Sequence, residues 1–358
     1  MKRIPRRGKS DPAPWGTGFD RWTDSNRHAG NYTEPSGETD VEPFQCNTSA
    51  RRADAPMIAG LFAVFADVVA PVFGIVLAAF LAGPRLGLQA RTLSRTAYYI
   101  FIPAFVFEII RPVHLGAADA FRMVAYIAAV HLTCAATGFA AARLLGRSRE
   151  TVAAFVLIAV FGNTGNFGLS LIEFRLGHEG MVSATIYFLG LTVITFAVGV
   201  GAATWARGGS MRAVLAVFRT PALLAFAVAV AVNLADAPVP LFATRMTGLL
   251  SGAMIPTMLV SLGVQLAEAG RPRLTTDLAI ASGLRLLAGP AIAFVLAGVF
   301  GIEGLARSTG ILQSAMPAAV LTAVIASEHR LLPDFVTHTV LVSTVLSFLT
   351  LTVLLALV

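Results

Sequence analysis

Residues 162–168, GNTGNFG, place glycines and amide side chains in the middle of a long apolar run. Asn163, Thr164 and Asn166 can donate hydrogen bonds to a carboxylate, and they can also replace backbone partners where a helix is interrupted. Each glycine costs roughly 1 kcal/mol in a helix interior, so three of them within seven residues predict an interruption. In hydrocarbon, unpaired backbone groups cost several kcal/mol more. Such a stretch therefore belongs inside the protein or beside a water-filled cavity.

A second interruption is expected in residues 313–319, QSAMPAA, where Pro317 lacks a backbone donor. Pro317 lies 153 residues after Thr164, and the same offset separates Pro103 from Pro256. Both interruptions therefore fall at the same place in two halves of the chain. Two broken helices that meet at mid-membrane would point the positive N-terminal ends of two half-helices at one site, which suits an anion.

The composition indicates that a lipid bilayer surrounds these elements. Of the 358 residues, 56% are hydrophobic and 13% are charged, and the mean hydropathy is +0.74. Ordinary soluble domains are about 45–50% apolar and about 25% charged. The net charge of +7 comes from arginines scattered between apolar runs, which is typical of membrane loops and not of a nucleic-acid surface. Two isolated cysteines predict neither a disulfide frame nor a metal site, and we expect no cofactor.

Residues 1–56 differ from the rest of the chain, because they are polar, rich in proline and glycine, and without helical periodicity. We expect a disordered tail. The chain's only lysines, Lys2 and Lys9, lie in this tail. This shift in usage suggests the hypothesis that translation starts at Met57.

From Met57 onward, the apolar pattern predicts an all-α membrane protein with ten transmembrane helices. The predicted spans are 58–83, 92–112, 118–142, 151–173, 181–205, 214–235, 244–267, 277–300, 305–327 and 334–357. Because each half has five helices, an odd number, the second half enters the membrane from the opposite face. Residues 57–205 and 206–358 are therefore expected to be two inverted repeats, with the fourth and ninth helices broken. Arginines near the loops divide twelve to five between the two sides, which predicts that both termini are extracytoplasmic in a multi-pass protein of the cell (inner) membrane.

Two motifs resemble the auxin efflux carrier family, whose bacterial members include organic-acid permeases of the malonate and malate type. GNTGNFGLSL, at residues 162–171, is similar to the family's fourth-helix signature, with Ser170 where proline is common. QSAMPAAVLTAVIASEH, at residues 313–329, is similar to its ninth-helix segment. The resemblance covers residues 57–358. It implies a scaffold domain of helices one, two, six and seven, and a transport domain of the other six that contains the crossed broken helices.

Substrate-binding residues are expected at both interruptions. The resemblance implies positions on the fourth and ninth helices, and Gln313 is added because it lies one turn before Pro317. The complete predicted set is Asn163, Thr164, Gly165, Asn166, Gly168, Gln313, Met316 and Pro317.

Ionisable residues inside apolar segments are candidates for function because they are costly there. Glu108 is a candidate for proton or cation coupling, and the alternative is an ion pair with Arg111 at i+3. Arg285 lies inside the eighth predicted span. We expect it to extend toward the cytoplasmic face; the alternative is that it neutralises an incoming anion.

Three further polar residues in apolar segments are expected to serve structure. His131, central in the third span, is interpreted as a hydrogen-bonded packing residue. Asn233 and Gln265 are expected to tie helices together.

These patterns together predict a secondary carrier of small organic anions, such as dicarboxylates or auxin-like carboxylates, that works by alternating access. An enzyme is not expected, because neither a Gly-x-Ser-x-Gly elbow nor a His-Glu-x-x-His motif is present. A sodium-coupled symporter of the bile-acid type, with the same ten-helix plan, and an anion channel stay open as alternatives. The expected partners are the anion and the bilayer. Proton or sodium coupling and a homodimer are left open, and nucleic acid is excluded.

Overall fold

A computed structural model describes residues 65–113, 116–207 and 216–358. Throughout these ranges the regular elements are helices, and the only strand-like pairing is an isolated bridge between Gly162 and Ala318. The polar tail predicted at 1–56, the start at Met57 and the beginning of the first predicted span lie outside the described residues.

The first half of the described chain combines α-helices with short π-helical turns. They are η1 (Phe65–Val69), α2 (Ala70–Ala82), α3 (Ala90–Thr96), η2 (Ala97–Phe101), α4 (Ile102–Ile110), α5 (Ala117–Leu144), α6 (Arg149–Val160), η3 (Thr164–Gly168) and α7 (Leu169–Arg207). Helix α7 turns at Gly177, whose φ of 65° and ψ of −167° place it outside the helical region. A side chain is strained at this φ, so glycine permits the turn between the fourth and fifth predicted spans.

The second half also combines α-helices with short turns, of which η4 is a 3-10 turn and η5 is a π-helical turn. Its elements are η4 (Ala216–Arg219), α9 (Pro221–Leu234), α10 (Leu241–Glu268), α11 (Thr276–Gly283), η5 (Leu284–Ala288), α12 (Gly289–Val299), α13 (Gly304–Ser314), α14 (Val320–Glu328) and α15 (Pro333–Leu357). The turns η1, η2 and η5 each end just before a helix that carries proline in its first two positions. Proline cannot donate to the preceding turn, and the wider π-helical turn accommodates this loss.

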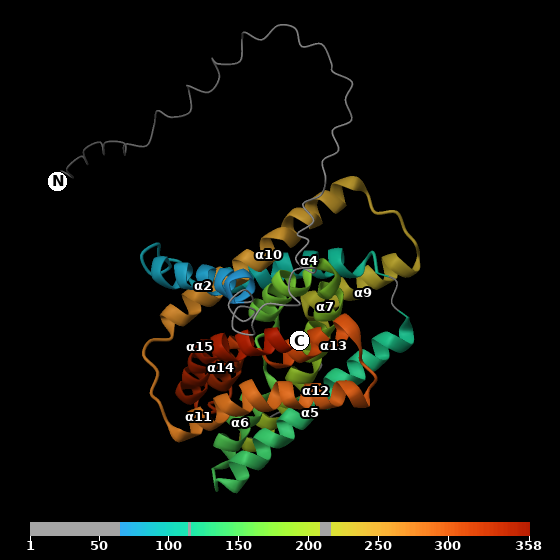
Figure 1. Cartoon of the computed structure of the whole chain (residues 1–358). Coiled ribbons are helices and arrows are strands. Elements are labelled where there is room, and N and C mark those ends of the chain that lie inside the picture. Colours follow the sequence, from blue (N-terminus) through green and yellow to red (C-terminus); the bar gives the residue numbers. More distant parts are fainter. Residues whose placement is uncertain (1–64, 114–115, 208–215) are drawn as a thin grey trace, which may run out of the picture. The chain divides into compact units, whose positions relative to one another are not determined.

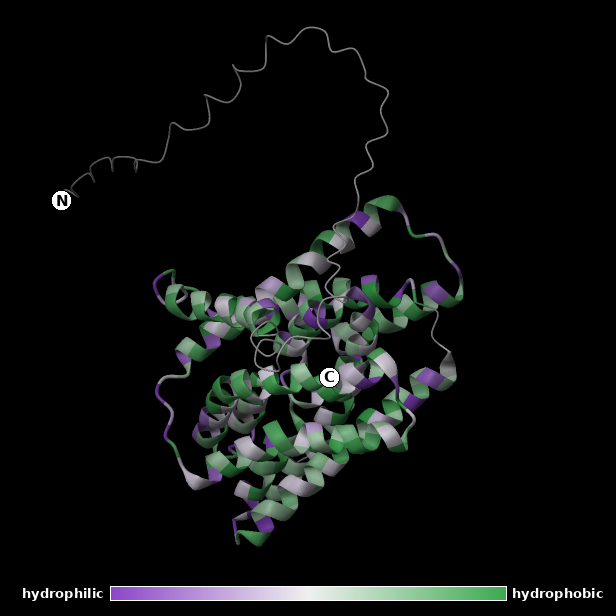
Figure 2. Ribbon diagram, viewed as in Figure 1, coloured by the Kyte–Doolittle hydropathy of each residue, from purple (hydrophilic) through white to green (hydrophobic). Residues whose placement is uncertain are grey.

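Seven helices in the described part of the chain are long and apolar enough to cross a membrane. They are Phe65–Ala82, Ala90–Ile110, Ala118–Leu144, Thr164–Gly199, Leu241–Glu268, Thr276–Val299 and Pro333–Leu357. The predicted spans 151–173 and 305–327 are interrupted helices, and the apolar helix within 214–235 is the shorter Pro221–Leu234. The structure therefore establishes an all-helical, multi-pass membrane protein, and the count of ten spans in two inverted repeats stays a prediction. Figure 2 shows hydrophobic residues along the helices and hydrophilic ones gathered toward loops and helix ends.

The helices of residues 65–358 pack in two groups (Figure 1). In one group α10 packs against α2, α3 and α4, and α4 packs against α9. In the other group α5 packs against α6, α7 and α12, α13 packs against α7 and α12, and α15 packs against α11 and α14. Helix α7 and the turn η3 also contact α10, so the first interruption borders both groups.

Small residues bring the helices of each group close together. A Cβ built on Gly263 of α10 would overlap the carbonyl oxygen of Val76 in α2. In the second group, a Cβ on Gly138 of α5 would lie 3.0 Å from the carbonyl oxygen of Phe155 in α6. Close backbone approach strengthens van der Waals packing, which drives helix association in lipid.

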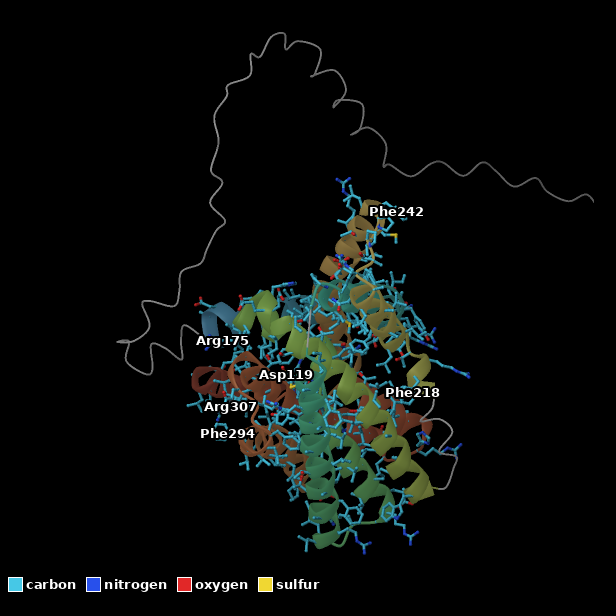
Figure 3. All side chains as sticks on the ribbon, turned by 90° about the vertical axis from the view of Figure 1, so that its right-hand side faces the viewer. Asp119, Arg175, Phe218, Phe242, Phe294 and Arg307 are labelled. Atoms are coloured by element: carbon cyan, nitrogen blue, oxygen red, sulfur yellow. The ribbon has the colours of Figure 1, made fainter. Side chains whose placement is uncertain are left out.

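Two arginines near the starts of their helices, Arg175 and Arg307, contact neighbouring helices (Figure 3). Arg175 of α7 donates to the carbonyl oxygen of Leu355 at 3.3 Å. The guanidinium of Arg307 in α13 lies 4.9 Å from the ring centroid of Phe294 in α12. These contacts tie α7 to α15 and α12 to α13 near their ends.

Candidate functional site

The first interruption lies between α6 and η3. Helix α6 ends at Val160, and Phe161 and Asn163 have ψ values of 87° and 54°, outside the α-helical range. The carbonyl of Asn163 accepts from the amides of Phe167 and Gly168, so the second half-helix starts there. The break forms with Ser170 in the place of the family's proline, and the Ser170 hydroxyl donates to the carbonyl of Asn166 at 3.2 Å. The interruption that the sequence predicts therefore forms without a proline at this position.

The second interruption lies between α13 and α14. Helix α13 ends at Ser314, and α14 begins at Val320 after a segment that contains Pro317. The amide of Thr322 donates to the carbonyl of Ala319 at 3.0 Å, within the first turn of the new half-helix. Pro317 separates two half-helices as predicted.

The two interruptions meet and pair through their backbones. The amide of Asn163 donates to the carbonyl of Pro317, and the amide of Ala319 donates to the carbonyl of Phe161, both at 2.8 Å. This is the antiparallel bridge centred on Gly162 and Ala318. Unpaired backbone groups are costly in a membrane interior, so each break supplies partners that the other has lost. We call the segment pair 161–168 and 313–319 the crossover.

Side chains around the crossover include polar atoms that are buried without a partner in the described part of the chain. Both amide atoms of Gln313 and the Nδ2 atom of Asn163 are in this state. Gln313 is 0% exposed and Asn163 is 4% exposed. Buried amides normally have partners, and each unpaired one costs about 1–3 kcal/mol. Such atoms also occur elsewhere in the described chain, for example Oε1 of Gln265, but at the crossover they lie beside two broken helices, which makes the crossover the candidate site.

Five of the eight predicted residues lie against a residue of the opposite break. Asn163 bonds to Pro317. A Cβ on Gly168 would overlap Oε1 of Gln313 and would lie 3.1 Å from Cγ of Met316, so this glycine lets the second break approach.

The other three predicted residues are on the first break. Thr164 is buried and Asn166 is half-buried. Gly165 faces Phe188 of α7, whose Cε2 would lie 2.9 Å from a Cβ at that position. Gly165 therefore serves packing between η3 and α7 in this conformation.

Arg285 is the residue whose position the sequence interpretation placed wrongly. It does not extend to the cytoplasmic face, because it is 1% exposed. Its Nε donates to the carbonyl of Met316 at 2.7 Å, and its two terminal nitrogens donate to the carbonyls of Ala159 at 2.7 Å and Ser314 at 3.0 Å. The negative ends of two half-helices attract the guanidinium inward more strongly than water attracts it outward. The only local signal was an arginine deep in a span, four residues before Gly289-Pro290.

Ser343 of α15 is a second contributor that the sequence did not reveal. Its hydroxyl oxygen accepts from the amide of Ala318 at 3.2 Å and donates to the carbonyl of Val340 at 3.1 Å. Serine is common in membrane helices, so its residue type gave no indication of this role.

Glu108 belongs to α4 and contacts α10. Its carboxylate is 3.8 Å from the guanidinium of Arg111 and accepts from the hydroxyl of Thr247. Asn233 of α9 donates to the carbonyl of Arg111 at 2.7 Å. The pairing of Glu108 with Arg111 is thus present, and Asn233 ties helices together as expected.

Two other polar residues have the structural roles expected of them. His131 is buried, and its Nε2 lies 2.8 Å from the hydroxyl of Tyr187. Gln265 donates from Nε2 to the hydroxyls of Ser94 and Ser261, at 2.8 and 3.1 Å. These contacts join α5 to α7 and α10 to α3.

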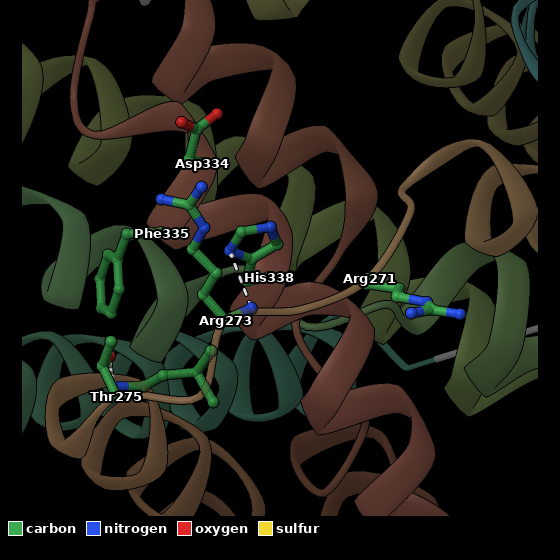
Figure 4. A pocket seen from close by; sticks show the side chains of 7 residues that line it. Arg271, Arg273, Thr275, Asp334, Phe335 and His338 are labelled. Atoms are coloured by element: carbon green, nitrogen blue, oxygen red, sulfur yellow. Dashed lines mark hydrogen bonds between the residues drawn. The ribbon is translucent and has the colours of Figure 1, made fainter.

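A pocket of about 450 Å³ lies apart from the crossover, between the segment after α10 and the start of α15. Figure 4 shows Arg271, Arg273, Asp334 and His338 around it, with the amide of Arg273 lying 3.5 Å from Nδ1 of His338. The carboxylate of Asp334 shares the pocket with the two arginines. None of the predicted substrate-binding residues lines it.

Comparison with known proteins agrees with this architecture. Residues 64–355 match the model of a family described as membrane transport protein. An uncharacterized transporter of Methanothermobacter thermautotrophicus is 30% identical over 264 residues, which are 74% of this chain and 87% of that protein. An uncharacterized transporter of Methanocaldococcus jannaschii is 24% identical over 270 residues, with 73% and 87% coverage. The chain, with its buried polar crossover, therefore belongs to the auxin efflux carrier-like membrane transport family and is a membrane transporter.

Proposed function

We propose that this transporter is a secondary carrier of small organic anions, such as dicarboxylates or auxin-like carboxylates, and that the crossover binds them. The observation that carries the proposal is the set of unpaired amide atoms on Asn163 and Gln313 beside two broken helices. An amide Nδ2 or Nε2 donates to carboxylate oxygens at little cost if it has no other partner to lose.

Electrostatics at the crossover favours an anion. The half-helices that begin at Thr164 and Val320 point N-terminal ends toward the crossing, each with roughly +0.5 of an elementary charge. Arg285 offsets the negative ends of α6 and α13, so the two positive ends stay uncompensated, and in the described part of the chain no carboxylate lies within ion-pair distance of Arg285. A site with this field and no acid opposite attracts carboxylates and disfavours cations.

The burial of the crossover supports transport by alternating access. Gln313, Met316 and Asn163 are buried, so a ligand reaches them only if neighbouring helices move. Phe167 of the first break packs edge to face on Phe73 of α2, with ring centroids 5.2 Å apart, at the border of the two helix groups. Movement of the group that contains α5–α7 and α11–α15 against the other group would expose the crossover. The proposal includes ten spans in two inverted repeats and an inner-membrane position with both termini outside.

A transport assay on the full chain in proteoliposomes tests this function. Uptake of a labelled dicarboxylate should saturate and should accelerate when the vesicles are preloaded with unlabelled substrate. Single-channel conductance in a planar bilayer would instead establish a pore and overturn the carrier.

A matched pair of asparagine variants tests the site. Asn163→Ala should reduce uptake at least about tenfold, which corresponds to about 1.4 kcal/mol of lost binding. Asn233→Ala removes an amide that bonds to Arg111 away from the crossover, and it should retain uptake. Equal uptake by the two variants would contradict the assignment of the crossover as the site.

A further inference from the structure

Arg285 joins both interruptions through one planar group. Its guanidinium donates to Ala159, which lies in the last turn of α6, and to Ser314, which ends α13. The third bond goes to Met316 inside the second break. All three acceptors are backbone carbonyl oxygens, at 2.7 to 3.0 Å.

The charges of these groups balance. A helix C-terminus carries roughly −0.5 of an elementary charge, so the two half-helix ends together carry about −1. The single positive charge of the Arg285 guanidinium offsets this negative charge. Because no acidic side chain in the described ranges forms an ion pair with Arg285, the helix ends themselves are its counter-charge.

The surrounding backbone is shaped for this side chain. A Cβ on Gly162 would overlap a terminal nitrogen of Arg285, so glycine is needed where the guanidinium crosses the first break. A Cβ on Gly289 would lie 2.7 Å from the carbonyl oxygen of Ser314, so this glycine lets η5 and α12 approach the end of α13. A planar fork of donors suits three carbonyls that converge from different directions, which a single ammonium group fits less well.

Half-helix C-terminal ends and unwound carbonyls are the groups that coordinate sodium in transporters with discontinuous helices. We propose that Arg285 is a tethered cation that fills this cation site permanently, so that the crossover binds its anion without a co-bound sodium ion. The statement about the anion rests on the proposed function, whereas the cation site itself does not. Removing the side chain should leave a cavity with three carbonyl acceptors that binds a free guanidinium ion.

Chemical rescue of the purified full-length protein tests the cation site without any substrate. Arg285→Ala should lower the melting temperature on the order of 10 °C, because three buried carbonyl oxygens lose their donor at once. Guanidinium chloride at low millimolar, non-denaturing concentration should then raise the melting temperature of this variant by several degrees, in a saturable manner. N-methylglucamine chloride at the same ionic strength is the reference salt, because sodium could itself enter the vacated site.

The wild-type protein and Arg307→Ala are the matched controls, since Arg307 lies over the ring of Phe294 away from the crossover. Neither should respond to guanidinium. Absence of rescue in Arg285→Ala, or an equal response in all three proteins, would overturn the proposal.

Sodium dependence provides a second readout that does not require the variant to fold. Wild-type uptake should be equal in sodium and in N-methylglucamine buffers, and a clear requirement for sodium would overturn the tethered cation. If the wild type transports no organic anion while guanidinium still rescues Arg285→Ala, the proposed substrate class fails and the cation site stands.

Discussion

Two glutamines in apolar segments of this chain differ in how their side-chain donors are used. Gln265 is half-buried at the seam between α10 and α3, where its Nε2 donates to Ser94 and Ser261, while its Oε1 has no partner in the described part of the chain. Gln313 is fully buried at the crossover, and neither its Nε2 nor its Oε1 has a partner. A polar side chain whose donor bonds to another helix holds the helices together. A buried side chain whose donor has no such bond can donate to a ligand. The partners of the side-chain donor, and not the residue type, therefore separate the structural glutamine from the one that we propose to bind substrate.

The largest effect is expected from a substitution that adds a side chain where the crossover is most tightly packed. Gly162→Val would push a side chain into the guanidinium of Arg285 and separate it from its carbonyl acceptors. We expect the free energy of unfolding to fall by about 3 kcal/mol or more, and uptake to be lost. Thermal unfolding and proteoliposome uptake measure the two effects. Gly201→Val is the control, because a Cβ there meets nothing within 4 Å, and a comparable loss in it would show that the crossover is not special.

An intermediate effect is expected from exchanging each glutamine for leucine. Gln313→Leu should weaken anion binding at least about tenfold while leaving stability unchanged or raised, because it removes unpaired buried polar atoms that cost about 1–3 kcal/mol. Gln265→Leu should lower stability by about 1 kcal/mol and retain binding, since it loses hydrogen bonds at a structural seam. Ligand-induced shifts in melting temperature measure both. If Gln265→Leu weakened binding while Gln313→Leu lowered stability and retained binding, the contrast between the two glutamines would be wrong.

The smallest effect is expected at Glu108. Glu108→Gln removes the charge that faces Arg111 and retains an acceptor for Thr247, so stability should change by less than about 1 kcal/mol. Uptake and its pH dependence should match the wild type, with Asn233→Ala as a neighbouring control. Loss of a pH dependence that the wild type shows would instead assign Glu108 to proton coupling and would extend the functional site beyond the crossover.

Local chemistry explains why the interruptions could be predicted. Three glycines in GNTGNFG and Pro317 in QSAMPAA disfavour a helix wherever they occur, because the cost arises from the backbone of each residue. The offset of 153 residues then placed the two breaks at matching positions. The same local reasoning identified His131 and Gln265 as structural residues, and their hydrogen bonds confirm this.

Partners that lie far apart in the sequence could not be predicted in this way. Gly165, a member of the predicted binding set, faces Phe188 of α7, and its neighbours in the sequence do not indicate this contact. The seven long apolar helices of the described ranges also differ in number from ten predicted spans, because two of the spans are interrupted helices and a third contains only the short helix Pro221–Leu234.

The sequence by itself determined that this chain is a membrane protein with two polar breaks, since hydropathy and the helix preferences of glycine and proline are properties of single residues. Only the tertiary structure decided that the breaks pair as Asn163 with Pro317 and Ala319 with Phe161. It also decided that Arg285 turns inward, because the carbonyls of Ala159 and Ser314 that attract it converge only after helices distant in the chain have packed.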